Sequence, residues 1–197
     1  MRLKIVQAGE PVLRQTARAL SVDEIRMPAM RELLAHMRET MRDAPGVGLA
    51  APQAGLGIQL AVIEDRPEYM AGVNPAALAE RERTPVEYFA LFNPKIVSYS
   101  EETVEFFEGC LSVAGFSALV RRARRVTVEY LDEQAEPCRL EASGWFARIL
   151  QHEIDHLNGQ LYIDRMETRT FSTMENLGRH WKDLAIAELR EKLEVDR

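Results

Sequence analysis

Hydrophobic residues recur at helical spacing near the start of the chain. In residues 22–42 the apolar positions are Ile25, Met30, Leu33, Leu34, Met37 and Met41. Because these positions fall three or four residues apart, they share one face and predict an amphipathic helix. Ser21 is a suitable N-cap for that helix, and Pro45-Gly46 would end it.

Two further stretches show the same helical spacing. Residues 143–157 predict a helix that Ser143 can cap and that Asn158-Gly159 would end. Residues 173–194 predict an amphipathic C-terminal helix. Core packing is the simpler interpretation of this last helix, and a partner surface is the alternative.

The strand-like segments lie between these helices. They cover residues 58–63, 89–99, 103–107, 125–131 and 137–142, with a hairpin turn at 132–135. Residues 64–88 are polar, contain three prolines and predict a long surface loop. Because the strands are clustered rather than alternating with helices, the sequence predicts an α+β fold. We expect antiparallel sheets packed around the 143–157 helix, with an N-terminal and a C-terminal helix, in a single domain over 1–197.

Composition restricts the function more than it restricts the fold. The chain has 197 residues and a formal net charge of −6, which disfavours direct nucleic-acid binding. It lacks an apolar run long enough to span a membrane. We expect the one basic cluster, residues 121–125, to be a solvated strand end. No secretory or transit segment is evident, so we expect a bacterial cytoplasmic protein with its two cysteines free.

The strongest chemical signal is His152-Glu153-Ile154-Asp155-His156 within the second predicted helix. Residues four positions apart share a helical face, so two imidazoles can hold one metal ion. Glu153 then lies where its carboxylate can take a proton from a metal-bound water. The alternative is that both histidines are ordinary packed or capped core residues.

A catalytic site of this kind needs a third ligand. In a zincin-like peptidase that ligand follows the helix, and the downstream candidates are Glu167, Glu175 and His180. The upstream candidates are Cys110 and Cys138. If both cysteines joined the histidines, the site would be closed and structural rather than catalytic.

The surroundings of Cys110 favour it over Cys138. Cys110 follows Gly109, which permits close backbone approach, in a turn between strand-like segments. The backbone N–H of Leu111 could point at a developing oxyanion. Cys138 has no such neighbours, and we expect a small, partly buried side chain. Gln53 ends a run of small residues and is either a second oxyanion donor or a strand cap.

Three segments together carry a family resemblance. G-V-G-L-A-A-P-Q from residue 46, E-G-C-L-S from residue 108 and Q-H-E-I-D-H-L from residue 151 resemble the three motifs of peptide deformylases, in the same order. Ser112-Val113-Ala114-Gly115-Phe116, Gly144-Trp145 and the 64–88 insertion are similar to the mitochondrial-type branch, of which the chain could be a bacterial member. Ser117 stands where many bacterial enzymes of the family carry Arg, which leaves open the shape of the loop over the substrate.

The resemblance implies a metal-dependent hydrolase of N-terminal protein processing. It would remove the N-formyl group from formyl-methionine of newly made polypeptides and release formate. The implied metal ligands are Cys110, His152 and His156, and the implied ion is Fe²⁺, with Zn²⁺, Ni²⁺ or Co²⁺ as substitutes. A metal-bound hydroxide would attack the formyl carbon, with Glu153 as general base and then acid.

The resemblance also implies the surrounding roles. Gln53 and the Leu111 N–H match the oxyanion donors. Residues that match the family's methionine pocket or its contacts with the substrate backbone are Val47, Gly48, Gly109 and Trp145. The implied partners are nascent formyl-Met polypeptides, with the ribosome as a further candidate. If a presequence is missing from this chain, the mitochondrial matrix is the alternative location. A zincin-like metallopeptidase and a non-catalytic, metal-stabilised interaction module are the rival functions.

Overall fold

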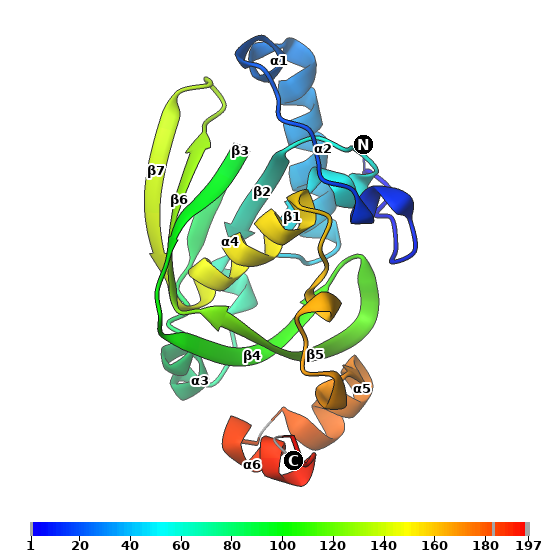
Figure 1. Ribbon diagram of the computed structural model, residues 1–197, viewed down its shortest axis with the longest axis vertical. Helices are drawn as coiled ribbons and strands as arrows, with labels where there is room; N and C mark the ends of the chain where they lie inside the picture. The colour runs from blue at the N-terminus through cyan, green and yellow to red at the C-terminus, as the bar shows by residue number, and fades with distance from the viewer. Residues whose placement is uncertain (1, 183, 196–197) are drawn as a thin grey trace.

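Two antiparallel sheets and a helix between them form the molecule (Figure 1). The computed structural model describes residues 2–182 and 184–195. The larger sheet has the strand order β1-β2-β3-β6-β7, and the smaller has the order β4-β5-β8. The helix α4 (Gly144–Leu157) crosses the middle of the molecule and contacts strands of both sheets. The predicted α+β fold is therefore confirmed.

The bounds of the elements are as follows. The strands are β1 (Gly48–Ala50), β2 (Leu60–Asp65), β3 (Val86–Tyr99), β4 (Thr103–Cys110), β5 (Val113–Ala123), β6 (Arg125–Leu131), β7 (Pro137–Ser143) and β8 (Ser172–Thr173). The other α-helices are α1 (Val22–Arg26), α2 (Pro28–Asp43), α3 (Pro75–Glu80), α5 (Met174–Asn176) and α6 (Ile186–Lys192). Short 3-10 turns include η2 (Ala51–Ala54) and η3 (Pro67–Tyr69).

The N-terminal helix expected over 22–42 is two helices. Met27, between α1 and α2, has extended backbone with ψ 141°. Proline disfavours helical geometry in the residue before it, and its fixed φ suits the first position of a helix, so Pro28 ends α1 and begins α2. Ser21 caps α1 as predicted, because its side chain accepts from the backbone N–H of Glu24.

Strand prediction failed most clearly in the smaller sheet. β5 was not predicted, because its middle residues are buried on successive positions and give no apolar–polar alternation. β4 continues to Cys110, three residues beyond the predicted end. The 64–88 segment is also more ordered than the expected loop, since it contains η3 and α3 and its ends belong to β2 and β3.

The C-terminal segment is not the single helix expected over 173–194. Thr173 belongs to β8, α5 is followed by a π-helical turn at Leu177–Trp181, and α6 is a separate helix after the extended Ala185. α6 packs against the smaller sheet: Leu189 is fully buried, and Arg190 Nη1 lies 2.8 Å from Glu105 Oε2 on β4. Within the described residues these contacts agree with core packing.

The start of α4 is held by backbone hydrogen bonds, one of them to the 64–88 segment, rather than by its predicted cap. Ser143 makes no side-chain capping bond. Instead the N–H of Gly144 donates to the carbonyl of Arg124, and the N–H of Trp145 donates to the carbonyl of Arg81 over 2.8 Å. Gly144 has φ +56°, and a Cβ there would lie 2.6 Å from the Arg81 carbonyl oxygen. Only glycine fits this position without displacement.

The hydrophobic core lies on both sides of the larger sheet. One cluster packs α4 residues such as Leu150 and Ile154 on Ile63 and Val128, and a second packs α2 on the opposite face. Across residues 2–182 and 184–195, no helix has the length and apolarity needed to cross a membrane. The core thus holds α4 rigidly across the sheet, which positions the residues described next.

Candidate metal centre

The side chains of Cys110, His152 and His156 meet in the centre of the molecule. The two histidines lie one helical turn apart on α4, and Cys110 is the last residue of β4. Their candidate ligand atoms all lie within 4.8 Å of one another, and Cys110 Sγ is 3.3 Å from His156 Nε2. A sulfur and two imidazole nitrogens are thus gathered at one point.

The other candidate ligands do not join this group. In the described part of the chain, this is the one group of three His, Cys, Asp or Glu side chains with ligand atoms this close together. Cys138 lies on β7, with Tyr130 of β6 as its register partner. Glu167, Glu175 and His180, the zincin-type candidates, lie outside the group as well. The structure therefore supports an open three-ligand site over a closed two-cysteine one.

Glu108, which sequence reasoning missed, orients one of the imidazoles. Its Oε2 lies 2.9 Å from His152 Nδ1, so the Nε2 atom is left to face an ion. Arg122 donates to both carboxylate oxygens over 2.9 and 3.0 Å, and Arg148 donates to Oε1 over 2.6 Å. Burial opposes ionisation of Glu108, but Arg122 and His152 outweigh it and hold the pKa well below its usual range.

The expectation of a solvated basic cluster at 121–125 was wrong for Arg122. This side chain is buried, and besides Glu108 it contacts Asp155 of α4. Asp155 also accepts from Arg165 Nε over 2.8 Å. In a strand, neighbouring residues face opposite sides, so Arg121 is exposed while Arg122 points into the core. The missed strand β5 therefore explains the missed role of Arg122 and, with it, of Glu108.

Glu153 is buried beside the histidines and lacks a partner for one oxygen. Its Oε2 has no hydrogen bond within the described structure. Gly48 of β1 permits this placement, because a Cβ at residue 48 would lie 2.2 Å from Glu153 Oε1. Burial raises the pKa of Glu153 to about 7. A carboxyl group with that pKa can both accept and release a proton near neutral pH.

The side chain of Gln53 caps the end of β1 and also reaches the ligand cluster. Its Oε1 accepts from the backbone N–H of Ala50 over 2.9 Å, which fixes the η2 turn. Its Nε2 lies 3.5 Å from Cys110 Sγ and 3.3 Å from Ser112 Oγ. The amide N–H₂ group is thus held next to the ligand cluster. Leu111 lies in the turn between β4 and β5 beside it.

A cavity of about 640 Å³ opens onto this cluster. All four residues expected to contact substrate line it, namely Val47, Gly48, Gly109 and Trp145. Gln53, Leu111, His152 and Glu153 line it too. Lining residues that sequence reasoning missed include Ile5, Phe116, Arg148, Ile149 and Met174. They come from four separate segments, and no spacing in the sequence connects these segments.

The donor set suits a divalent transition-metal ion. A cysteine sulfur and two imidazole nitrogens match the soft and intermediate ligands of zinc and iron sites. The bond from Glu108 to His152 is the outer contact usual for a metal-bound histidine. Three protein ligands beside a cavity leave room for a fourth position, as in catalytic sites.

Comparison with known proteins identifies the family. The sequence model of the polypeptide deformylase family matches residues 2–172. Peptide deformylase 1 of Bifidobacterium longum is 43% identical over 97% of this chain and 85% of its own length. The chloroplastic peptide deformylase 1A of tomato, Solanum lycopersicum, is 44% identical over 88% of this chain, which spans 62% of that protein.

Solved structures agree with the sequence relatives. A crystal structure of a class I type b peptide deformylase from Acinetobacter baumannii, with Met-Ala-Ser bound, has a TM-score of 0.76 and 34% identity over 84% of this chain and 99% of that one. The Thermotoga maritima peptide deformylase has a TM-score of 0.70 and 34% identity, covering 85% of this chain and 99% of that one. The chain belongs to the peptide deformylase family.

Proposed function

We propose that this protein removes the N-formyl group from formyl-methionine at the start of newly made polypeptides and releases formate. Membership of the peptide deformylase family supports this reaction. The Acinetobacter baumannii relative binds Met-Ala-Ser, a peptide with the free N-terminal methionine that deformylation leaves. The relatives include bacterial and chloroplastic or mitochondrial proteins, and for this chain we propose the bacterial cytoplasm.

One observation carries the proposal. Glu153 follows His152 on α4, lines the same cavity as Cys110 and His152, and has a buried carboxylate oxygen without a hydrogen-bond partner. A buried polar atom of this kind is costly unless it serves a ligand or a reaction. A purely structural metal site would have no use for it.

We propose Fe²⁺ as the ion, held by Cys110, His152 and His156, with Zn²⁺, Ni²⁺ or Co²⁺ able to replace it. When bound, such an ion would polarise the formyl carbonyl and make a water molecule more acidic. Glu153 takes a proton from the attacking water at Oε2. It then gives that proton to the methionine nitrogen as the formyl C–N bond breaks.

The remaining residues of the site bind the substrate and stabilise the negative charge that develops on it. Gln53 Nε2 and the N–H of Leu111 donate hydrogen bonds to the formyl oxygen as negative charge develops on it. Val47, Gly48, Gly109 and Trp145 hold the methionine and the peptide backbone. The geometry that supports these roles is the position of all six residues around one cavity.

Formate release from formyl-Met-Ala-Ser tests the reaction. Protein purified without oxygen and loaded with Fe²⁺ or Ni²⁺ should release formate and Met-Ala-Ser. Glu153→Gln should reduce kcat by roughly 10²–10⁴-fold, the usual contribution of a general acid–base group. Absence of formate from protein with a full complement of metal would overturn the proposed function.

Cys110→Ser separates this function from a zincin-like peptidase that uses only the α4 histidines and a downstream carboxylate. Deformylation should be lost in Cys110→Ser and retained in Cys138→Ser. Peptide-bond cleavage that survives Cys110→Ser would favour the peptidase instead.

We also propose that the substrates are nascent chains met at the ribosome. Co-sedimentation of the protein with ribosomes tests that contact, and its absence would remove it.

A further inference from the structure

The two proposed oxyanion donors lie beside different sheets. Gln53 is in η2, which follows β1 of the larger sheet, whereas Leu111 is in the turn between β4 and β5 of the smaller sheet. Two donors stabilise one oxygen best when their spacing is fixed before the reaction. The Gln53 amide reaches Ser112 Oγ over 3.3 Å, but the same amide has to face the substrate oxygen. The two segments therefore need a further connection.

Three consecutive residues near the start of the chain make this connection. The N–H of Val6 donates to the carbonyl of Gln53 over 2.9 Å, and the N–H of Ala8 donates to the carbonyl of Ser112 over 2.7 Å. Gln7 lies between them. We call residues 6–8 the N-terminal strap. The strap is thus bonded to η2 at one end and to the β4–β5 turn at the other.

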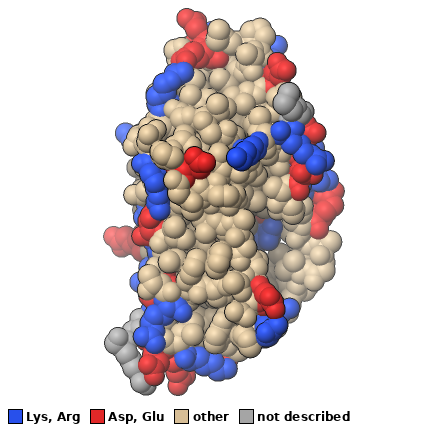
Figure 2. All heavy atoms as spheres, turned by 90° about the vertical axis from the view of Figure 1, so that its right-hand side faces the viewer, with Lys and Arg blue, Asp and Glu red and all other residues tan. Residues whose placement is uncertain are grey.

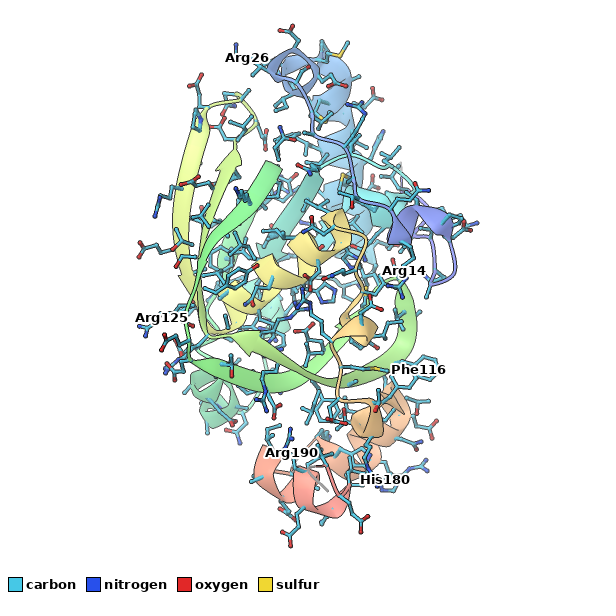
Figure 3. All side chains as sticks on the ribbon, viewed as in Figure 1. Arg14, Arg26, Phe116, Arg125, His180 and Arg190 are labelled. Carbon is cyan, nitrogen blue, oxygen red and sulfur yellow. The ribbon has the colours of Figure 1, made fainter. Side chains whose placement is uncertain are left out.

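The strap leads along the face of the molecule that carries the β4–β5 turn. Arg14, which follows the strap along the chain, and Phe116 of β5 lie on the same side of the molecule (Figure 3). On that side, uncharged side chains cover most of the middle (Figure 2). Residues 5–9 contain no charged side chain. The polar links of the strap are therefore hydrogen bonds rather than ion pairs.

The side chain of Gln7 binds the β4–β5 turn at two points. Its Nε2 donates to the carbonyl of Leu111 over 3.0 Å, and its Oε1 accepts from the N–H of Ala114 over 3.3 Å. The amide therefore bridges the turn, from its first residue to the start of β5. Gln7 also lines the cavity of the proposed active site, so this bridge stands beside the metal centre.

Strand pairing is irregular where Gln7 binds. Gly109 is the register partner of Ser117, but the next residue, Cys110, is the partner of Val113. Among the described residues, 114–116 of β5 consequently have no register partner on β4. An irregularity of this kind interrupts the ladder and redirects the chain. The ladder alone therefore does not fix the turn, and the hydrogen bonds of Gln7 supply part of what it lacks.

We propose that Gln7 is a positioning residue, which acts through the strap on the spacing of the Gln53 and Leu111 donors. This inference rests on the proposed function. Gln7 holds the Leu111 carbonyl, and Val6 holds the main chain of Gln53. Hydrogen bonds to a charged oxygen are stronger than bonds to a neutral one, so misplaced donors cost more in the transition state than in the bound substrate. Loss of Gln7 should therefore lower kcat and leave KM nearly unchanged.

Hydrolysis of formyl-Met-Ala-Ser by metal-loaded variants tests this role. Gln7→Met keeps the length of the side chain and removes both of its hydrogen bonds. We expect kcat to fall about fivefold, the factor that corresponds to one ordinary hydrogen bond, with KM within about twofold of the wild-type value. Gln7→Glu keeps the acceptor for Ala114 and loses the donor to Leu111, so its kcat should fall as well. Gln134→Met, at an exposed glutamine between β6 and β7, is the matched control and should keep the wild-type kcat.

A double-mutant cycle with Gln53→Ala distinguishes positioning from a general effect on the fold. Independent sites give additive changes in free energy, so their rate factors multiply. If Gln7 sets the spacing of two donors, that spacing no longer matters once Gln53 has lost its amide. Gln7→Met should then lower kcat by less than about twofold in the Gln53→Ala protein. The same fall in kcat as in the wild-type background would overturn the proposal.

The other outcomes are equally distinct. If Gln7→Met raises KM and leaves kcat unchanged, Gln7 contacts the substrate instead, and the positioning role is overturned. Wild-type kinetics of Gln7→Met would also overturn it, while the proposed function stands. If wild-type protein with a full complement of metal yields no formate, both fall. Gln7 is exposed, so the melting temperature and metal content should stay unchanged. A large fall in melting temperature would assign the strap to folding and overturn the proposal.

Discussion

Gly48 and Glu153 show how one missing side chain creates space for a reactive group. The Glu153 carboxyl occupies the volume that a Cβ at residue 48 would need. Gly48 has no positive φ that would otherwise call for glycine. Glycine is required at residue 48 because of this contact alone. A substitution there therefore tests where the Glu153 carboxylate lies.

Substituting Gly48 should therefore damage activity more than folding. Gly48→Ala would bring the new methyl group to within 2.5 Å of Glu153 Cδ, so the carboxyl has to move. We expect kcat to fall by about 10²-fold, comparable with loss of a general base. Gly57→Ala is the matched control, because a Cβ at residue 57 meets nothing within 4 Å. Equal activity of the two variants in a formate assay would contradict this placement of Glu153.

The raised pKa of Glu153 predicts a pH effect on stability in metal-free protein. Its pKa moves from 4.5 to about 7 on burial. Between these values the folded state keeps a proton that the unfolded state releases, so the free energy of unfolding decreases as pH rises. Glu153→Gln lacks this effect. Relative to the wild type, its free energy of unfolding should rise by about 3 kcal/mol between pH 4.5 and 7.5, as measured by urea unfolding. Parallel pH curves for the two proteins would refute the shift.

At the scale of elements, Glu108 joins β4 to α4 and β5. It contacts His152 and Arg148 of α4 and Arg122 of β5. All four side chains lie in the interior, so the Glu108 carboxylate takes the place of solvent as counter-charge to both arginines, and Asp155 gives Arg122 a second carboxylate. The same contacts set the direction of an imidazole at the metal centre, so the packing of these elements and the chemistry of the site depend on one carboxylate.

Removing the Glu108 carboxylate should destabilise the folded protein. Glu108→Ala leaves the Arg122 and Arg148 cations short of their counter-charge and is expected to lower the free energy of unfolding by about 3–5 kcal/mol. Glu129→Ala breaks a solvent-exposed ion pair with Arg139 and should cost less than about 1 kcal/mol. Denaturant midpoints for both variants provide the comparison. A small effect of Glu108→Ala would mean that water enters and solvates the arginines.

The elements also show what sequence reasoning could and could not recover. The α4 pattern was predictable because helical spacing and the two histidines are local features. Pro28 signals the break after Met27, which helical spacing alone does not reveal. β5 and the Arg122–Glu108 pair were not predictable from alternation, because burial on both faces of a strand removes the alternating pattern. The cavity-lining residues Phe116 and Met174 come together only through tertiary contacts.

For the whole molecule, the metal centre links the two sheets. Cys110 belongs to the smaller sheet, whereas the histidines lie on the helix that packs on the larger one. A ligand that binds only the folded state stabilises it in proportion to the logarithm of its concentration. Bound metal should therefore stabilise the complete fold as well as take part in catalysis.

Metal addition should raise the melting temperature accordingly. At a free concentration near 100 Kd, the gain is about 2.7 kcal/mol. For a chain of this length, that corresponds to a rise of roughly 5–10 °C in Tm. Cys110→Ser should lose most of the rise, and Cys138→Ser should retain it. If calorimetry shows the same rise for Cys110→Ser as for wild type, the ion binds elsewhere.

The contact between Gly144 and the Arg81–Glu82 turn has a consequence for building chimeras between relatives. That turn occupies the space of any side chain at residue 144 and accepts the hydrogen bond from Trp145. Transplanting the 66–85 segment into a relative with another residue at this position would create a clash at the first turn of α4. The 66–85 segment and the Gly144-Trp145 pair have to be exchanged together, as one structural unit.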